Sequence, residues 1–175
     1  MTATHPILAE FQQHCHQHFI CYALAVGSLN NFVSDLGNGP PASLAFFNED
    51  NQHQRSLAAR MTIDDLRQLG VPEGLFSDIL AKAILVSLYA GWDEHFRVLI
   101  ARSIGAKKAT VRCNLMGDLR LIRNCIIHAQ SIVTNEHEKC TELPWLKDAG
   151  HLTISLKMMI DFFSRASRMQ ISFSQ

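Results

Sequence analysis

The chain has 175 residues, about one domain's worth, and its composition (47% hydrophobic, 18% charged) is globular rather than disordered. A formal net charge of zero excludes a uniformly basic nucleic-acid-binding protein, but it still allows a local basic patch. No apolar run reaches about 18 residues, and no basic head precedes an apolar stretch at the N-terminus. We therefore expect no membrane span, no secretory signal and a cytoplasmic location. The five cysteines form no Cys-x-x-Cys pair, which favours free thiols.

The first half of the chain predicts two helices joined by a loop. Residues 5–30 carry an apolar stripe at three- and four-residue steps, which is typical of a helix with one buried face. Residues 31–60 are rich in glycine, proline, asparagine and glutamine and predict a long polar loop. Thr62, followed by Asp64 and Asp65, begins a short helix that ends at Gly70.

The second half predicts three longer helices. Residues 72–104 are apolar nearly all round, which is typical of the central helix of a bundle. Residues 111–133 form the next helix and residues 134–151 a polar loop, after which Leu152–Ser155 is a candidate extended piece. Ser155 is a candidate N-cap for a last helix through about Arg168. Its expected inward residues are Leu156, Met159, Ile160, Phe163 and Ala166. The predicted fold is an all-α bundle of four main helices plus a short one, in a single domain over residues 1–175.

Charge is unevenly distributed along this neutral chain. Residues 35–78 hold seven acidic side chains against three arginines, whereas residues 97–123 hold seven basic side chains against Asp118 alone. This asymmetry predicts an anionic partner near the second segment, although an ordinary solvated face is the alternative.

The helix expected at 111–133 has two dissimilar faces at 100° per residue. Its expected inward arc contains Leu115, Leu119, Ile122, Ile126, Ala129 and Val133. The opposite arc contains Gly117, Arg120, Leu121, Asn124, His128 and Ser131, with Arg123 on its flank. Asn124 and His128 stack four residues apart, whereas Arg123 and His128 lie about 140° apart around the helix. The long arginine side chain can swing across that angle. Such an arc suits a groove between two copies of the helix.

Arg123-Asn124-x-x-x-His128 matches an Arg-x4-His motif with a polar residue after the arginine, and the preceding helix carries Trp92, Asp93 and Phe96. In these features the chain resembles the HEPN superfamily of ribonucleases over roughly residues 75–170. The resemblance implies a HEPN-like bundle whose motif helices pair in a homodimer. It also implies cleavage of RNA without a metal or other cofactor, through attack of the ribose 2′-hydroxyl on the adjacent phosphate.

The resemblance further implies a role for each motif residue. His128 is the general acid or base, Arg123 holds the phosphate, and Asn124 orients by hydrogen bonding. Histidine titrates near neutrality and the guanidinium fork matches a phosphate, so elementary chemistry agrees. Arg120 is expected to add a phosphate contact, and Asp93 or Glu94 to orient His128 or Arg123. RNA is expected to pass over three basic residues that lead into the motif helix: Lys107, Lys108 and Arg112.

Two other functions are compatible with the same residues. One is a non-catalytic HEPN-like module that dimerises and binds a protein or nucleotide; the other is a helical scaffold without a nucleic-acid role. For the ribonuclease interpretation, the family context implies a bacterial toxin–antitoxin or anti-phage effector, restrained by an antitoxin or other regulatory protein. His14 and His18 stand four apart and could chelate an ion, but no second ligand pair has suitable spacing, so we expect no metal site.

Overall fold

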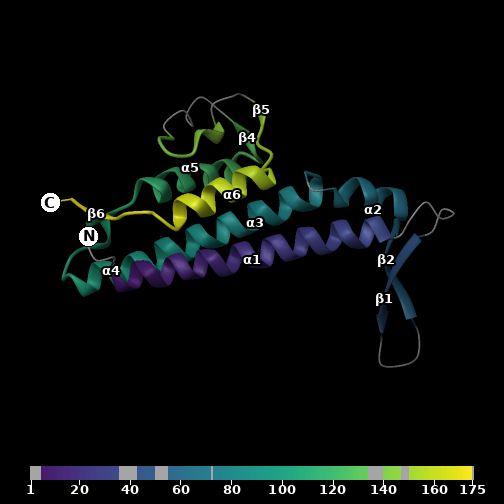
Figure 1. The fold of residues 1–175 in the computed structure, drawn as a ribbon, viewed down its shortest axis with the longest axis horizontal. Coiled ribbons are helices and arrows are strands. Elements are labelled where there is room, and N and C mark those ends of the chain that lie inside the picture. The colour runs from purple at the N-terminus through teal and green to yellow at the C-terminus, as the bar shows by residue number, and fades with distance from the viewer. Residues whose placement is uncertain are drawn as a thin grey trace.

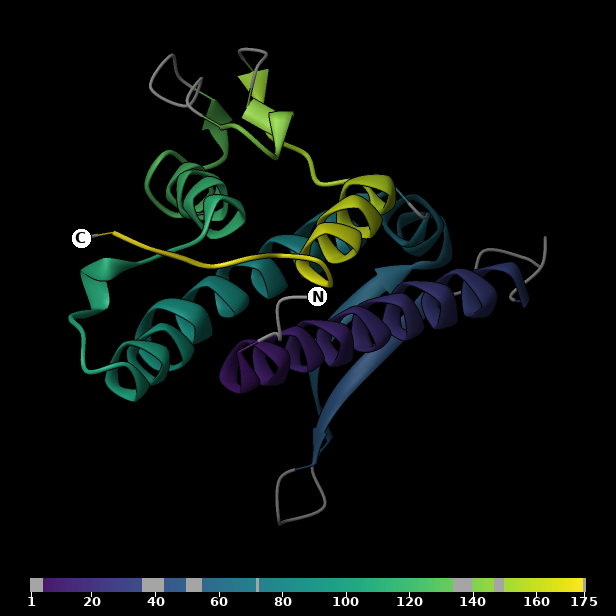
Figure 2. The same cartoon turned by 60° about the vertical axis from the view of Figure 1, so that its left-hand side comes forward.

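The structure, a computed structural model, describes residues 5–35, 43–49, 55–71, 73–133, 140–146 and 150–174. It is predominantly helical, which confirms the predicted all-α bundle (Figure 1). The main helices are α1 (Pro6–Asp35), α3 (Leu75–Gly91), α5 (Asn114–His128) and α6 (Leu156–Ala166), and the short helix is α2 (Ile63–Gly70). α1 and α3 run side by side along the length of the molecule, and α5 and α6 lie over α3 (Figures 1 and 2).

Helix α1 buries the stripe expected from its sequence. Leu8, Phe11, Cys15, Tyr22 and Val26 are buried against the other helices, because residues three, four and seven apart share one side of a helix. The helix continues to Asp35, five residues beyond its predicted end.

The predicted loop over residues 31–60 is wrong. Its first residues continue α1, and strands β1 (Ser43–Glu49) and β2 (Arg55–Thr62) pair as an antiparallel hairpin. The register shifts between Phe46 and Phe47, which is a β-bulge. A bulge reverses the alternation of faces within a strand, so no period-two pattern was visible in the sequence. The hairpin projects away from the helices (Figures 1 and 2). Residues 36–42 and 50–54 lie outside the described residues.

Helix α2 begins and ends where its sequence predicts. The Thr62 hydroxyl accepts a hydrogen bond from the Asp65 amide at 3.0 Å, and the Thr62 amide donates to the Asp65 carboxylate at 3.3 Å. This reciprocal capping box satisfies two backbone donors that a helix start leaves without intrahelical partners.

The predicted helix 72–104 is divided into three segments. It begins at Leu75, because Gly74 is the N-cap, and Pro72 lies outside the described residues. α3 continues through a π-helical turn (Trp92–Phe96) into α4 (Arg97–Ser103), and Gly105 follows with a φ of +66°. Residues 75–103 are long and apolar enough to cross a membrane by those criteria alone. In the structure, 44% of that apolar window is buried inside the helical bundle.

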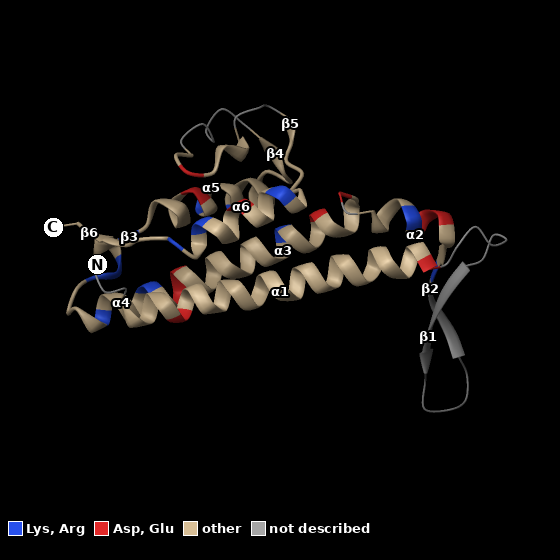
Figure 3. Ribbon diagram, in the orientation of Figure 1, with Lys and Arg blue, Asp and Glu red and all other residues tan. Residues whose placement is uncertain are grey.

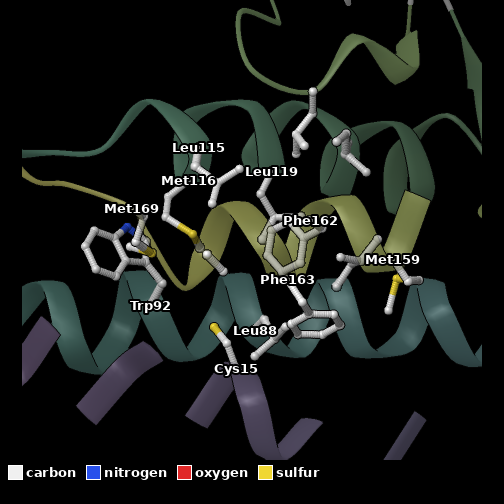
Figure 4. Packing of buried hydrophobic residues seen from close by; sticks show 14 of the residues in the cluster. Cys15, Leu88, Trp92, Leu115, Met116, Leu119, Met159, Phe162, Phe163 and Met169 are labelled. Atoms are coloured by element: carbon white, nitrogen blue, oxygen red, sulfur yellow. The ribbon is translucent and has the colours of Figure 1, made fainter. Parts of the chain in front are cut away.

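The core lies where α1, α3, α5 and α6 converge. Figure 4 shows Leu119 of α5 and Phe162 of α6 on one side of the core above Leu88 of α3, with Trp92 at one end of the same cluster. These four residues are at most 2% exposed. Because such packing tolerates little change of volume, the core fixes how α5 lies against α3.

Helix α5 is shorter at both ends than the predicted helix 111–133. Its flanks are strands β3 (Val111–Arg112), paired with β6 (Ser172–Phe173), and β4 (Ile132–Val133), paired with β5 (Gly150–His151). The expected loop 134–151 is described only in part and includes β5 and a short helical turn at Pro144–Leu146. The candidate extended piece Leu152–Ser155 forms no strand.

Helix α6 confirms Ser155 as its N-cap. The Ser155 hydroxyl accepts from the Met158 amide at 3.2 Å, and the helix ends at Ala166 rather than near Arg168. Met159, Phe163 and Ala166 are buried as expected and Leu156 is half-buried, but Ile160 is 49% exposed, and Phe162 is buried instead.

Candidate functional site

The two motif residues at the end of α5 are in direct contact. Nη1 of Arg123 lies 3.1 Å from Nε2 of His128, and the same Nη1 donates to Oδ1 of Asn124 at 3.1 Å. The arginine side chain extends across the angle that separates positions 123 and 128, so the fork reaches the imidazole. Arg123 and Asn124 are half-buried, and His128 is exposed.

The contact with Arg123 determines whether Nε2 of His128 donates or accepts a hydrogen bond. A guanidinium only donates hydrogen bonds, so Nε2 of His128 accepts here and carries a lone pair. The Nε and Nη2 groups of Arg123 make no hydrogen bond within the described part of the chain and can donate to a ligand. The pair therefore offers a basic nitrogen beside a positively charged donor fork.

A strained turn holds His128 at the end of its helix. Gln130 and Ser131 have φ angles of 51° and 65°, in the left-handed region that L-residues rarely adopt. The Ser131 amide donates back to the Cys125 carbonyl at 2.9 Å, and the Ser131 carbonyl accepts from Leu152 at 2.7 Å. These bonds turn the chain into β4 and make His128 the last helical residue.

The outward arc predicted for this helix is therefore correct only for the positions that lie within α5. Gly117, Arg120 and His128 are exposed, whereas Leu121 packs partly against the core. Ser131 lies beyond the helix and is buried. On the expected inward arc, Leu115, Leu119 and Ile122 are buried. Ile126 and Ala129 are only half-buried, and Val133 lies in β4.

A cavity of about 320 Å³ lies beside the motif, between α5 and the α3–π-turn segment. Its walls contain five residues that the sequence singles out: Asp93, Glu94, Arg120, Arg123 and Asn124. The remaining lining residues are Val86, Tyr89 and Ala90. We name it the motif cavity. Asp93 and Glu94 belong to the π-helical turn, a feature often found at functional sites because it redirects side chains.

Asp93 does not orient the motif, contrary to expectation. Its carboxylate accepts from Arg97 at 3.0 Å and from Lys108 at 2.7 Å. Burial by itself would raise the pKa of Asp93, but the hydrogen bonds from Lys108 and Arg97 outweigh it and lower that pKa below its ordinary value. Glu94 is exposed and makes no hydrogen bond or ion pair among the described residues, so it is the available carboxylate in this cavity.

The predicted basic residues differ in availability. Lys108 is committed to Asp93, whereas Lys107, Arg112 and Arg120 are exposed and lack a carboxylate partner in the described part of the chain. Figure 3 shows basic residues on α4, on the segment leading to β3 and on α5. The expected basic segment is thus brought to one end of the bundle and along its motif helix.

Sequence reasoning missed the role of Asp118. This buried carboxylate accepts from the backbone amides of Thr141, Glu142 and Leu143 at 2.8, 2.5 and 2.8 Å. These hydrogen bonds hold residues 141–143 against α5. The spacing of Asp118 from Leu115 and Ile122 places it on the inward arc, so a buried polar role was detectable.

The histidines of α1 are engaged locally. Nδ1 of His18 lies 2.9 Å from the His14 carbonyl, and the two rings are in edge-to-face contact. Burial, followed by repulsion from His18 and His95, lowers the pKa of His14. Within the described ranges no group of three or more histidine, cysteine or acidic side chains is arranged to hold a metal ion.

Comparison with protein-family models, curated proteins and solved structures finds no match to this chain. Its function is therefore argued from the chemistry of the site.

Proposed function

We propose that this protein is a metal-independent endoribonuclease of HEPN type, acting as a cytoplasmic homodimer. The observation that carries the proposal is the contact between the Arg123 guanidinium and Nε2 of His128, beside Asn124 and open to solvent. A basic nitrogen next to a phosphate-binding fork is the minimal equipment for cleaving RNA through its own 2′-hydroxyl.

The proposed reaction follows from these groups. When RNA binds, Nε2 of His128 exchanges its hydrogen bond from Arg123 for one from the ribose 2′-hydroxyl. It then takes that proton, and the resulting oxygen attacks the adjacent phosphorus. The bond from phosphorus to the 5′-oxygen breaks, which leaves a 2′,3′-cyclic phosphate and a 5′-hydroxyl. Nε and Nη2 of Arg123 donate to the phosphate oxygens, and the bond from Nη1 to Asn124 keeps the fork in position.

A second copy of the chain supplies what one copy lacks. The leaving 5′-oxygen needs a proton, and one His128 cannot be both base and acid at the same moment. We assign the acid role to a protonated His128 of the second copy, which gives its proton to the 5′-oxygen. The exposed end of α5 suits pairing, because Ile127, next to His128, is 44% exposed. A two-fold axis at this end would bring two Arg–His pairs to one cleft.

The test is cleavage of end-labelled RNA in EDTA. We expect wild type to cut and to leave 2′,3′-cyclic phosphate ends. His128→Ala and Arg123→Ala are expected to lose about 10²–10⁴-fold in rate. Arg123→Lys keeps the charge but loses the fork, so it is expected to be nearly as impaired.

Matched controls make that result specific. His16→Ala and Arg102→Ala remove exposed side chains of the same types on α1 and α4, away from the motif, and should leave the rate unchanged. Circular dichroism and sedimentation should first show folded dimers. Equal cutting by wild type and His128→Ala, or no cutting by wild type across several RNA classes, would contradict the proposal. The latter result would favour a non-catalytic binding module.

We further propose a toxin–antitoxin or anti-phage role, in which a regulatory protein restrains the nuclease. Expression of wild type in a bacterial host should slow growth, and His128→Ala should relieve the effect at equal protein level. Equal toxicity of a folded His128→Ala variant would contradict this role.

A further inference from the structure

A second cavity adjoins the motif cavity at the start of α5. It measures about 420 Å³, and its walls come from α3, the π-helical turn, β3, the first turns of α5 and Thr141. Tyr89 and Arg120 line both cavities. A strand bound at Arg123 can therefore continue past Arg120 without leaving the surface. We name this second space the flanking cavity.

The flanking cavity has free positive charge. Arg97, Arg112 and Arg120 all line it. Arg97 is held by Asp93 and by the Val111 carbonyl, at 3.0 and 2.9 Å. Arg112 and Arg120 are exposed and have no carboxylate partner in the part of the chain that the structure describes. Asp118 is the acidic residue among those that line the cavity, and its carboxylate accepts hydrogen bonds from three backbone amides. Two guanidinium groups thus remain available for an anion.

The wall of the flanking cavity combines polar and apolar surface in about equal parts. Trp92 and Met116 form part of its wall and are each 2% exposed, and Tyr89 presents a half-buried aromatic ring. Gly117 adds no side chain, so the space above the first turns of α5 stays open. Exposed guanidinium groups near the accessible part of the Tyr89 ring match a ligand that combines phosphate with a flat base.

We propose that the flanking cavity binds the nucleotide next to the cleaved bond of a single-stranded RNA. Its phosphate lies at Arg112 and Arg120, and its base packs against the ring of Tyr89. The proposal rests on the proposed ribonuclease function for the identity of the ligand. It adds that the enzyme reads at least one unpaired nucleotide beyond the Arg123–His128 pair. The RNA segment at the site must therefore be single-stranded.

Binding can be measured apart from cleavage. The probe is a fluorescein-labelled 2′-O-methyl RNA hexanucleotide, which lacks the attacking hydroxyl and so stays intact. Anisotropy titration of the full chain at fixed salt gives its affinity. We expect Arg112→Ala to weaken binding about tenfold or more, the usual effect of losing a charged hydrogen bond. Arg102→Ala removes an exposed arginine outside both cavities and should change affinity less than twofold.

A second variant tests occupancy of the cavity without altering charge. Gly117→Leu projects a side chain into the flanking cavity, and no protein atom lies within 4 Å of its first added carbon. We expect at least tenfold weaker binding. Gly27→Leu makes the same change at an equally open glycine of α1 and should be neutral. If sedimentation shows that Gly117→Leu alters the oligomeric state, the affinity of the Arg112→Ala variant tests the proposal instead.

Three outcomes overturn the proposal: equal weakening by Arg112→Ala and Arg102→Ala, unchanged affinity of a dimeric Gly117→Leu variant, or binding of a polyglutamate peptide in place of the RNA probe. The proposed function fails separately. Tight probe binding that needs Arg112, without cutting of unmodified RNA, would retain the subsite and reject the nuclease. Conversely, RNA cleavage at an unchanged rate by the Arg112→Ala variant would retain the nuclease and reject the subsite.

Discussion

Nη1 of Arg123 lies 3.1 Å from Nε2 of His128, although the two residues point to different sides of α5. The contact exists because the long Arg123 side chain carries its guanidinium far from the backbone. In addition, His128 is the last residue of α5, just before the turn at Gln130. The contact leaves the imidazole as an acceptor and two further groups of the guanidinium free. The proposed chemistry depends on that combination.

Asn124→Ala should slow RNA cleavage about tenfold without unfolding the protein. The substitution removes one of the two acceptors that hold Nη1 of Arg123, and one hydrogen bond to a charged group corresponds to about 1.5 kcal/mol. Single-turnover cleavage measures the effect. Asn31→Ala, an exposed asparagine of α1, is the matched control. An undiminished rate for Asn124→Ala would show that the fork needs no such support.

Asp118→Ala should lower the free energy of unfolding by about 3–5 kcal/mol, because three backbone amides lose their acceptor in a buried place. Asp118→Asn keeps an acceptor oxygen and should lose less, about 1–2 kcal/mol. Urea unfolding at pH 7 measures both. Asp161→Ala, which breaks a surface pair with Arg165, should cost under about 1 kcal/mol. A similar loss for Asp118→Ala and Asp161→Ala would contradict the anchoring role.

Asp93→Asn should lower stability by about 0.5–1 kcal/mol at pH 7, the range for partly exposed ion pairs. Because the pKa of Asp93 is lowered in the folded state, its stabilising effect is present above the ordinary carboxyl pKa near 4. It is lost as the pH falls from there through the lowered value. The difference in unfolding free energy between wild type and variant should therefore shrink below about pH 4. A difference that stays constant from pH 7 to pH 3 would contradict the assignment.

Gln130→Gly should raise the free energy of unfolding by up to about 1 kcal/mol, since glycine adopts a φ of 51° without the steric cost of a β-carbon. Gln130→Ala retains the β-carbon and is the control, with no gain expected. Thermal and urea unfolding measure stability. If Gln130→Gly also slows cleavage, the rigid turn contributes to positioning His128. Equal stability of the glycine and alanine variants would show that this turn carries no strain.

The sequence by itself determined the features that depend on neighbours within one or two helical turns. The buried stripe of α1, the caps at Thr62 and Ser155 and the two faces of α5 all follow from local spacing. Within α5 the same spacing placed Asn124 and His128 on the outward arc and Arg123 on its flank, and the resemblance to an Arg-x4-His motif then singled out these three residues. Helical periodicity and capping are local properties, so they can be read from the chain without its fold.

Only the tertiary structure decided the features that join distant segments. The β1–β2 hairpin was hidden by its bulge, and Asp93 proved to be bound by Lys108, fifteen residues away. Asp118 accepts hydrogen bonds from residues that follow α5 in the chain. The motif cavity exists because the core packs α5 against the π-helical turn. Each depends on how helices pack and how loops close, which the order of residues within one segment does not encode.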